Sequence, residues 1–229
     1  MSEVELTKQE MQQIIARNIA AMLKPDTYVN LGVGLPTLVA NYLTPEQNII
    51  VQSENGLIGA CGDIPLDSPD YNYEVIGSSG FSTRYKPGAS FFDSAMSFGM
   101  IRGGHIDATV LGTMEVDQEG NIANYMIPGK LVVGMGGAMD LCSGAREVII
   151  ATFHTQKGRP KLLKKCRLPL TAVGKAKWVV TEQAMFEIGG GKAHLRAFNP
   201  RFAVDDILAG VEADVEVADD LREMVGCEA

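Results

Sequence analysis

The sequence predicts an α/β fold: an open, mainly parallel sheet covered by helices on both faces, with added β-hairpins. Three observations lead to this prediction. Short runs rich in valine and isoleucine recur along the chain, as expected for strands buried on both faces. Segments with apolar residues at helical spacing alternate with these runs. Two pairs of apolar runs are separated by glycine-containing turns, which is typical of hairpins.

The first elements follow from capping and helix-breaking residues. Residues 7–10 have the spacing of a capping box, and apolar residues then recur at helical spacing until Pro25 ends the pattern. Residues 28–31 are predicted to form a buried strand that ends in a Gly-Val-Gly turn. Pro36 suits the first turn of a helix running to about Leu43, because its missing N–H has no helical acceptor at that position.

The remaining elements are assigned by the same criteria. Strands are expected at residues 48–52, 73–76, 106–111, 147–152 and 178–181, helices at 92–102 and 205–208, and hairpins that join 114–116 to 122–126 and 186–188 to 194–198. No repeat, low-complexity tract or linker divides the chain. We therefore expect one domain over residues 1–229.

Composition excludes several classes of protein. No stretch of roughly 18 apolar residues is present, and the polar, acidic start is unlike a secretion signal, so we expect no membrane span and a cytoplasmic location. The four cysteines are far apart and no histidine stands at metal-ligand spacing, which indicates reduced thiols and no metal site. The net charge of −8 argues against binding to nucleic acid or to an anionic membrane.

The charge is distributed unevenly along the chain. Residues 157–167 hold six basic side chains and no acidic one, whereas residues 205–228 are strongly acidic. A basic run of this kind is most often a solvated face. Contact with a polyanionic ligand or with an acidic neighbour is the alternative.

Two glycine-rich motifs are candidates for ligand binding. The first, Gly32-Val33-Gly34, has the start of a dinucleotide fingerprint, but Thr37 replaces its third glycine, so a nicotinamide- or flavin-dependent oxidoreductase is a weak alternative. The second is the run 134–137, whose glycines can turn backbone N–H groups toward an anion. Taken by itself, the second run is better explained as a tight turn between a strand and a helix.

Glu54 is the strongest catalytic candidate. It directly follows a buried strand, at the edge of a parallel sheet where ligands collect, and glycines leave room around it. A carboxylate at such a position can act as a general base or as a covalent nucleophile. No G-x-S-x-G motif competes with it.

Four motifs together resemble the family I CoA-transferases, specifically the β subunit of the acetate/butyrate–acetoacetate and succinyl-CoA:3-oxoacid enzymes. They are NLGVGLP at 30–36, QSENG at 52–56, IRGGH at 101–105 and GMGGAMDL at 134–141. The resemblance implies a CoA-transferase or NagB-like three-layer fold. It also implies that Glu54 is the catalytic residue, and that Asn30, Gly136 and Gly137 contribute to an oxyanion or CoA site.

The resemblance further implies a mechanism and partners. Coenzyme A is a substrate and no cofactor is needed: CoA moves between a short-chain acyl-CoA and a carboxylic acid through a γ-glutamyl-CoA thioester. An α subunit is expected, in a heterodimer or heterotetramer. The segment 77–86 departs from the family pattern close to the expected acyl pocket. A succinyl-CoA:3-oxoacid or 3-oxoadipate enzyme, an acyl-CoA hydrolase and a non-catalytic scaffold subunit remain alternatives.

Overall fold

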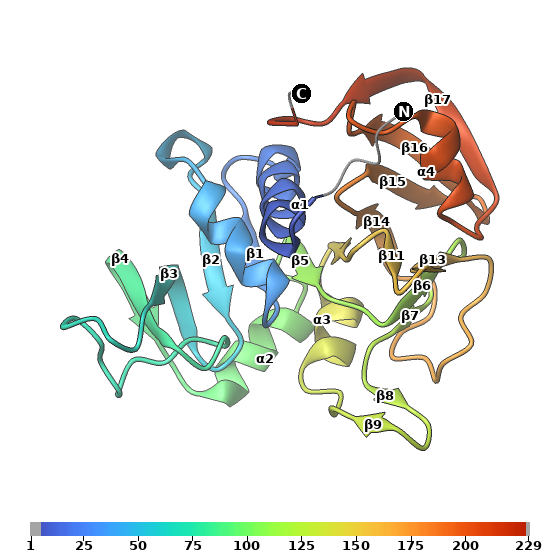
Figure 1. The fold of residues 1–229 in the computed structure, drawn as a ribbon. Helices are drawn as coiled ribbons and strands as arrows, with labels where there is room; N and C mark the ends of the chain where they lie inside the picture. Colours follow the sequence, from blue (N-terminus) through green and yellow to red (C-terminus); the bar gives the residue numbers. More distant parts are fainter. Residues whose placement is uncertain (1–5, 228–229) are drawn as a thin grey trace.

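The computed structural model describes residues 6–227 and contains a ten-stranded sheet in the order β17-β16-β15-β14-β10-β5-β1-β2-β3-β4 (Figure 1). Its centre is parallel and comprises β14 (Ala176–Val180), β10 (Glu147–Ala151), β5 (Ala108–Leu111), β1 (Tyr28–Leu31) and β2 (Ile50–Ser53). The mainly parallel sheet and the added hairpins are therefore confirmed.

Hairpins extend the sheet on both sides of this centre. Beside β2 lie β3 (Leu57–Ile64) and β4 (Ser82–Phe91), and beside β14 lie β15 (Ala184–Gly189) and β16 (Lys192–Phe198), each antiparallel to the neighbour on the side of the centre. The last strand, β17 (Val215–Glu223), runs parallel to β16.

Helices cover both faces of the sheet, so the central strands are buried on both faces. On one face lie α1 (Lys8–Met22) and the 3₁₀ helix η1 (Leu35–Tyr42), and on the other lie α2 (Ser94–Arg102) and α3 (Ala138–Gly144). Alternate residues of β10 point to the two cores, with Ile149 on the α1 side and Ile150 on the α2 and α3 side. This three-layer arrangement explains why the strand sequences are almost continuously apolar.

Local signals account for the bounds of the helices. The predicted capping box is present, with Thr7 Oγ1 accepting from the N–H of Glu10 at the start of α1. Asp93 caps α2 by accepting from the N–H of Met96 at 2.8 Å. Helices α2 and α3 approach so closely that a Cβ on Gly144 would overlap the carbonyl oxygen of Ile101, so glycine at this position permits the contact. The last helix, α4 (Val204–Ala209), matches the predicted one.

Short elements complete the fold. They are the 3₁₀ turn η2 (Pro45–Gln47), a three-stranded sheet of β13 (Leu162–Leu163), β6 (Glu115–Asp117) and β7 (Ile122–Ala123), the pair β8 (Met126–Ile127) and β9 (Leu131–Val132), and the pair β11 (Thr155–Gln156) and β12 (Arg159–Pro160). Within residues 6–227, no helix is long and apolar enough to cross a membrane.

Two local predictions are corrected by the structure. Residues 73–76 do not form a strand: the side chain of Asn72 accepts from the N–H of Glu74 at 2.9 Å and turns the chain, and only Ile76 makes an isolated bridge. The segment after Pro36 is a 3₁₀ helix rather than an α-helix. It contains β-branched Thr37 and Val39, whose side chains are restricted in an α-helix.

The basic run finds acidic partners within the same chain. Lys164 pairs with Asp214 at 2.9 Å and Arg167 with Glu212 at 2.6 Å, both at exposed positions. Exposed pairs of this type contribute little to stability. The run is therefore partly a solvated face and partly the neighbour of the acidic C-terminal region.

A candidate active site at the carboxyl ends of β1 and β2

Glu54 lies where β2 ends, at the edge of the sheet shared by the carboxyl ends of the parallel strands. Strands β1 and β2 pair in parallel, with Asn30 opposite Gln52, and Glu54 begins the turn into β3. That turn requires glycine at position 56, where φ is +126° and a Cβ would overlap the carbonyl oxygen of Phe92. The nucleophile candidate is thus held on a turn packed backbone to backbone against the chain that enters α2.

The structure brings Glu54 and Gly137 together, although 83 positions separate them in the sequence. A Cβ on Gly137 would overlap Oε2 of Glu54 and would stand 3.0 Å from Cζ of Phe98 and 3.1 Å from Cδ of Glu54. Gly137 immediately precedes α3, and its φ of −81° is open to any residue. Glycine is therefore needed here for space beside the carboxylate rather than for backbone conformation.

Gly136 differs from its neighbour in this respect. Its φ is +52°, in the left-handed region, and a Cβ would meet no atom within 4 Å. Among the described residues, no backbone acceptor is bonded to the N–H of Gly136 or of Gly137. The N–H groups of Gly137, the residue beside the Glu54 carboxylate, and of Gly136 before it are therefore available to a ligand.

The electrostatic environment makes the Glu54 carboxylate more basic than usual. Burial raises the pKa of the half-buried Glu54 carboxyl, and the negative charge of Asp140 raises it further. No hydrogen bond from residues 6–227 counters these effects. Asp140 is itself bound by Arg102, with Nε and Oδ1 2.7 Å apart. A desolvated carboxylate with no internal hydrogen bond is better suited to attack a carbonyl than a solvated one.

Asn30 lies near the site but is fully engaged in the sheet. Its side chain is buried, and Nδ2 donates to both the carbonyl oxygen of Gln52 at 3.3 Å and its Oε1 at 2.7 Å. Its Oδ1 accepts from Thr109 at 3.3 Å, and Gln52 donates on to Ser97 at 2.7 Å. In this arrangement Asn30 ties β1 to β2, so its part in an oxyanion site stays a prediction.

Sequence reasoning missed two features of the site. Asp140 was not recognised as a charge that acts on Glu54, and nothing in the sequence pattern places α3 at that distance. The second feature lies on the other side of the turn, where Ser53 and Asn55 bind residues 76–78. The departure of residues 77–86 from the family pattern was the one signal that pointed to this segment.

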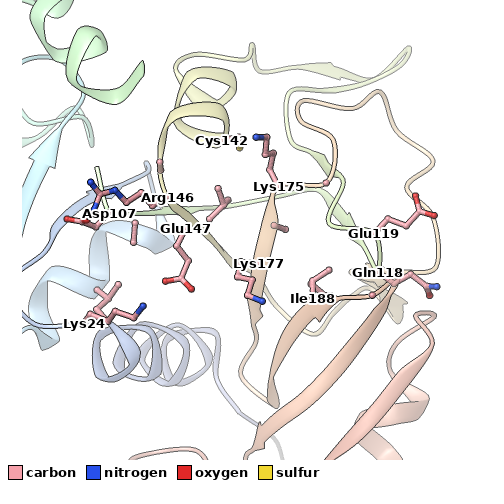
Figure 2. Close-up of a pocket in the computed structure, with 18 of the residues that line it drawn as sticks. Lys24, Asp107, Gln118, Glu119, Cys142, Arg146, Glu147, Lys175, Lys177 and Ile188 are labelled. Carbon is pink, nitrogen blue, oxygen red and sulfur yellow. Dashed lines mark hydrogen bonds and ion pairs between the residues drawn. The ribbon is translucent and has the colours of Figure 1, made fainter. Parts of the chain in front are cut away.

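Other candidate features lie apart from this site. A cavity of about 720 Å³ opens at the opposite, amino edge of the parallel strands and is lined by charged side chains that include Lys24, Arg146 and Lys175 (Figure 2). None of the predicted site residues lines it. Residues 6–227 contain no group of three or more His, Cys, Asp or Glu side chains that could hold a metal ion.

The glycines of the Gly-Val-Gly motif have a structural explanation. A Cβ on Gly32 would stand 3.0 Å from the carbonyl oxygen of Val110, so this glycine is set by the close approach of β1 to β5. Gly34 has a φ of +85° and opens the turn into η1. These positions need no dinucleotide to explain them.

Comparisons with known proteins are consistent across sequence and structure. The family model described as coenzyme A transferase matches residues 12–210. The β subunit of acetate CoA-transferase from Haemophilus influenzae is 50% identical over 214 residues, covering 93% of this chain and 95% of that protein. The corresponding subunit of succinyl-CoA:3-ketoacid coenzyme A transferase from Helicobacter pylori is 46% identical over 208 residues, covering 90% and 99%.

Solved structures share the fold at lower sequence identity. An acyl-CoA transferase from Escherichia coli superposes with a TM-score of 0.73 at 22% identity, over 96% of this chain and 44% of that longer one. Glutaconate coenzyme A-transferase of Acidaminococcus fermentans superposes with a TM-score of 0.66 at 18% identity, over 96% of this chain and 89% of that one.

Proposed function

The chain belongs to the coenzyme A transferase family as a β subunit, and from this we propose that it moves CoA between a short-chain acyl-CoA and a carboxylic acid through a covalent intermediate on Glu54. The observation that carries the proposal is the meeting of Glu54 with Gly137. The half-buried carboxylate stands beside Gly137, and the N–H groups of Gly136 and Gly137 have no acceptor within the described backbone.

The proposed reaction proceeds in two exchanges. The Glu54 carboxylate attacks the thioester carbonyl of the donor, and the collapse of the tetrahedral intermediate expels CoA thiolate and leaves an acyl anhydride on Glu54. The thiolate then attacks the γ-carbonyl of Glu54, which releases the donor acid and forms a γ-glutamyl-CoA thioester. The acceptor carboxylate reverses both steps. One thioester replaces another, so no external energy source is required.

Each attack creates an oxyanion that must be stabilised. We assign this task to the N–H groups of Gly136 and Gly137. Removal of one such donor costs about 3 kcal/mol of transition-state stabilisation in known cases. Asn30 is the third proposed member. Both hydrogens of its amide are donated to Gln52, so it reaches a reacting oxygen only if the side chain of Gln52 moves.

For the acyl group we propose the acetate/butyrate–acetoacetate class. The relatives named for acetate are 50% and 47% identical to this chain, and those named for succinyl-CoA:3-ketoacid transfer reach 46%. Succinyl-CoA:3-oxoacid transfer is therefore the second candidate. Rates with acetyl-CoA and succinyl-CoA as alternative donors to acetoacetate decide between them.

An α subunit is the proposed partner, because relatives of this chain are named as β subunits. Apolar side chains on the segments around the site support this. Val33, which follows β1, Val132, which precedes the glycine run, and Met139, in the first turn of α3, are 64%, 72% and 51% exposed. A partner that covers them would also exclude water, which otherwise hydrolyses the anhydride.

The experiment uses the chain co-expressed with the proposed α subunit. The pair is incubated with acetyl-CoA or acetoacetyl-CoA and then with borohydride, which reduces an enzyme-bound thioester to an alcohol, and peptides are analysed by mass spectrometry. We expect the modification at Glu54 in the native pair and none after Glu54→Gln. If a pair that binds CoA is never modified, the covalent transferase mechanism is wrong and hydrolysis or a scaffold role takes its place.

A further inference from the structure

We propose that Ser53, Asn55 and the segment 76–78 form a clamp that fixes the turn carrying Glu54. This inference rests on the proposed role of Glu54 as nucleophile. Within it, Ser53 and Asn55 are positioning residues, since their side-chain hydrogen bonds go to each other and to residues 76–78 and none goes to the Glu54 carboxylate. We call the three together the Ser53 clamp.

Glu54 and its two neighbours in sequence make their contacts on different sides of the turn. The side chain of Glu54 lies against Gly137 and Phe98, on the face covered by α2 and α3. Its two neighbours make their contacts elsewhere, with residues 76–78. The residues before and after the nucleophile are thus held from one side while the carboxylate is presented on another.

The hydrogen bonds of the clamp form a closed ring. The N–H of Ser78 donates to Oγ of Ser53 at 2.8 Å, and Ser53 in turn donates its single hydroxyl hydrogen to Oδ1 of Asn55 at 2.6 Å. Nδ2 of Asn55 donates back to the carbonyl oxygen of Ile76 at 2.6 Å. Ser53 is 3% exposed, so water does not readily replace the two bonds made by its hydroxyl, whereas the bond from Asn55 to Ile76 is exposed.

The clamping segment is itself anchored to the sheet. The N–H of Gly77 donates to the carbonyl oxygen of Phe81 at 2.9 Å, and the hydroxyl of Ser79 donates to Asp63 on β3 at 2.9 Å. The hydroxyl of Ser78 also reaches the carbonyl oxygen of Leu31, where β1 ends, at 3.4 Å. Movement of the Glu54 turn therefore requires several contacts to break together.

The kinetic consequence follows from the geometry of attack. A carboxylate must meet the thioester carbonyl at about 3–3.5 Å with correct alignment, and a displacement of about 1 Å costs on the order of 10²-fold in rate. The clamp, whose side-chain hydrogen bonds join Ser53 and Asn55 to each other and to residues 76–78, is assigned no contact with acyl-CoA. Its loss should lower kcat and the rate of adduct formation while the KM for acyl-CoA changes by less than about twofold.

The test compares Ser53→Ala and Asn55→Ala with Thr181→Ala, each in the co-expressed pair. Thr181 is a matched control because it is equally buried and its hydroxyl also accepts a backbone N–H, from Ala184 at 3.0 Å, without a hydrogen bond to the Glu54 turn or to residues 76–78. Single-turnover formation of the Glu54–CoA adduct is measured by quenched-flow mass spectrometry. The KM for acyl-CoA and the melting temperature are measured alongside.

We expect Ser53→Ala and Asn55→Ala to slow adduct formation by about 10- to 100-fold, whereas Thr181→Ala lowers the melting temperature and leaves that rate unchanged. Ser53→Thr, which keeps the hydroxyl, should restore most of the rate. If Ser53→Ala does not fold, the exposed position of Asn55 still supplies the test. Adduct formation at the native rate in Asn55→Ala overturns the clamp, whereas absence of adduct in the native pair overturns the proposed function instead.

Discussion

Replacement of Gly137 by alanine should separate catalysis from stability at this site. The new methyl group would overlap Oε2 of Glu54, and Cζ of Phe98 would stand only 3.0 Å from it. Because φ at Gly137 is −81°, alanine adopts this backbone without strain. The overlap must therefore be relieved by the flexible end of Glu54, which carries the proposed nucleophile.

The magnitude follows from that displacement. Moving the carboxylate by about 1 Å costs on the order of 10²-fold in rate. At 1.36 kcal/mol for each factor of ten, this corresponds to about 2.7 kcal/mol in the activation barrier. The cost to folding is smaller, about 0.5–1.5 kcal/mol, because only one side chain leaves its preferred rotamer.

The assay measures CoA transfer from acetyl-CoA or succinyl-CoA to acetoacetate in the co-expressed pair, together with the thermal melting curve. Gly99→Ala is the matched control. Gly99 is exposed within α2, a Cβ there meets no atom within 4 Å, and alanine favours the helix by about 0.5–1 kcal/mol. A Gly137→Ala pair with native kcat would refute the reasoning, as would a loss of activity fully explained by unfolding.

Three further predictions concern charge, thiols and the chain end. Because burial and Asp140 raise the pKa of Glu54 in the folded state, its stabilising contribution is complete below the ordinary glutamate pKa and is lost as pH rises through the raised value. Glu54→Gln should therefore melt higher than the native chain above that window, and equal melting curves from pH 3 to pH 8 would contradict the raised pKa. A thiol reagent at pH 8 should modify the exposed Cys61 first, because burial raises the pKa of Cys142 to about 11 and leaves roughly one thiolate in a thousand; Cys61→Ser should abolish the fast phase. Asn18→Ala should lower the free energy of unfolding by about 1–3 kcal/mol in a denaturant titration, because the buried amide exchanges hydrogen bonds with Val225, and an unchanged midpoint would show that the contact is not stabilising.

The central sheet could be predicted because its residues obey a strong local rule. Strands buried on both faces are apolar throughout, so runs such as 147–152 identify themselves without knowledge of their neighbours. The edge strands do not obey this rule. Residues 215–223 read VEVADDLRE and are largely exposed, as expected for an edge that is protected by charge against further pairing. Such a strand resembles a loop in sequence, and β17 was missed for that reason.

The site was predictable in part. Glu54 could be placed at the end of a strand, and the glycine run could be identified as unusual, but nothing local predicts that Gly137 stands against the carboxylate. That contact depends on how α3 packs beside α2, which is set by the approach of Gly144 to Ile101. Asn30 shows the opposite limit. The resemblance implies that Asn30 contributes to an oxyanion or CoA site. In the structure the register of β1 and β2 places Asn30 opposite Gln52, and its side chain donates to Gln52.

Gly56 limits how sequences with this fold can diverge. The atom that its missing side chain would strike is the carbonyl oxygen of Phe92, part of the main chain, so no substitution at a neighbouring position creates the room. A substitution of Gly56 in the turn that bears Glu54 therefore cannot be compensated by a change of a neighbouring side chain. Variation in acyl preference is expected to accumulate in segments with free side-chain space, such as residues 77–86, while the turn itself stays unchanged through long divergence.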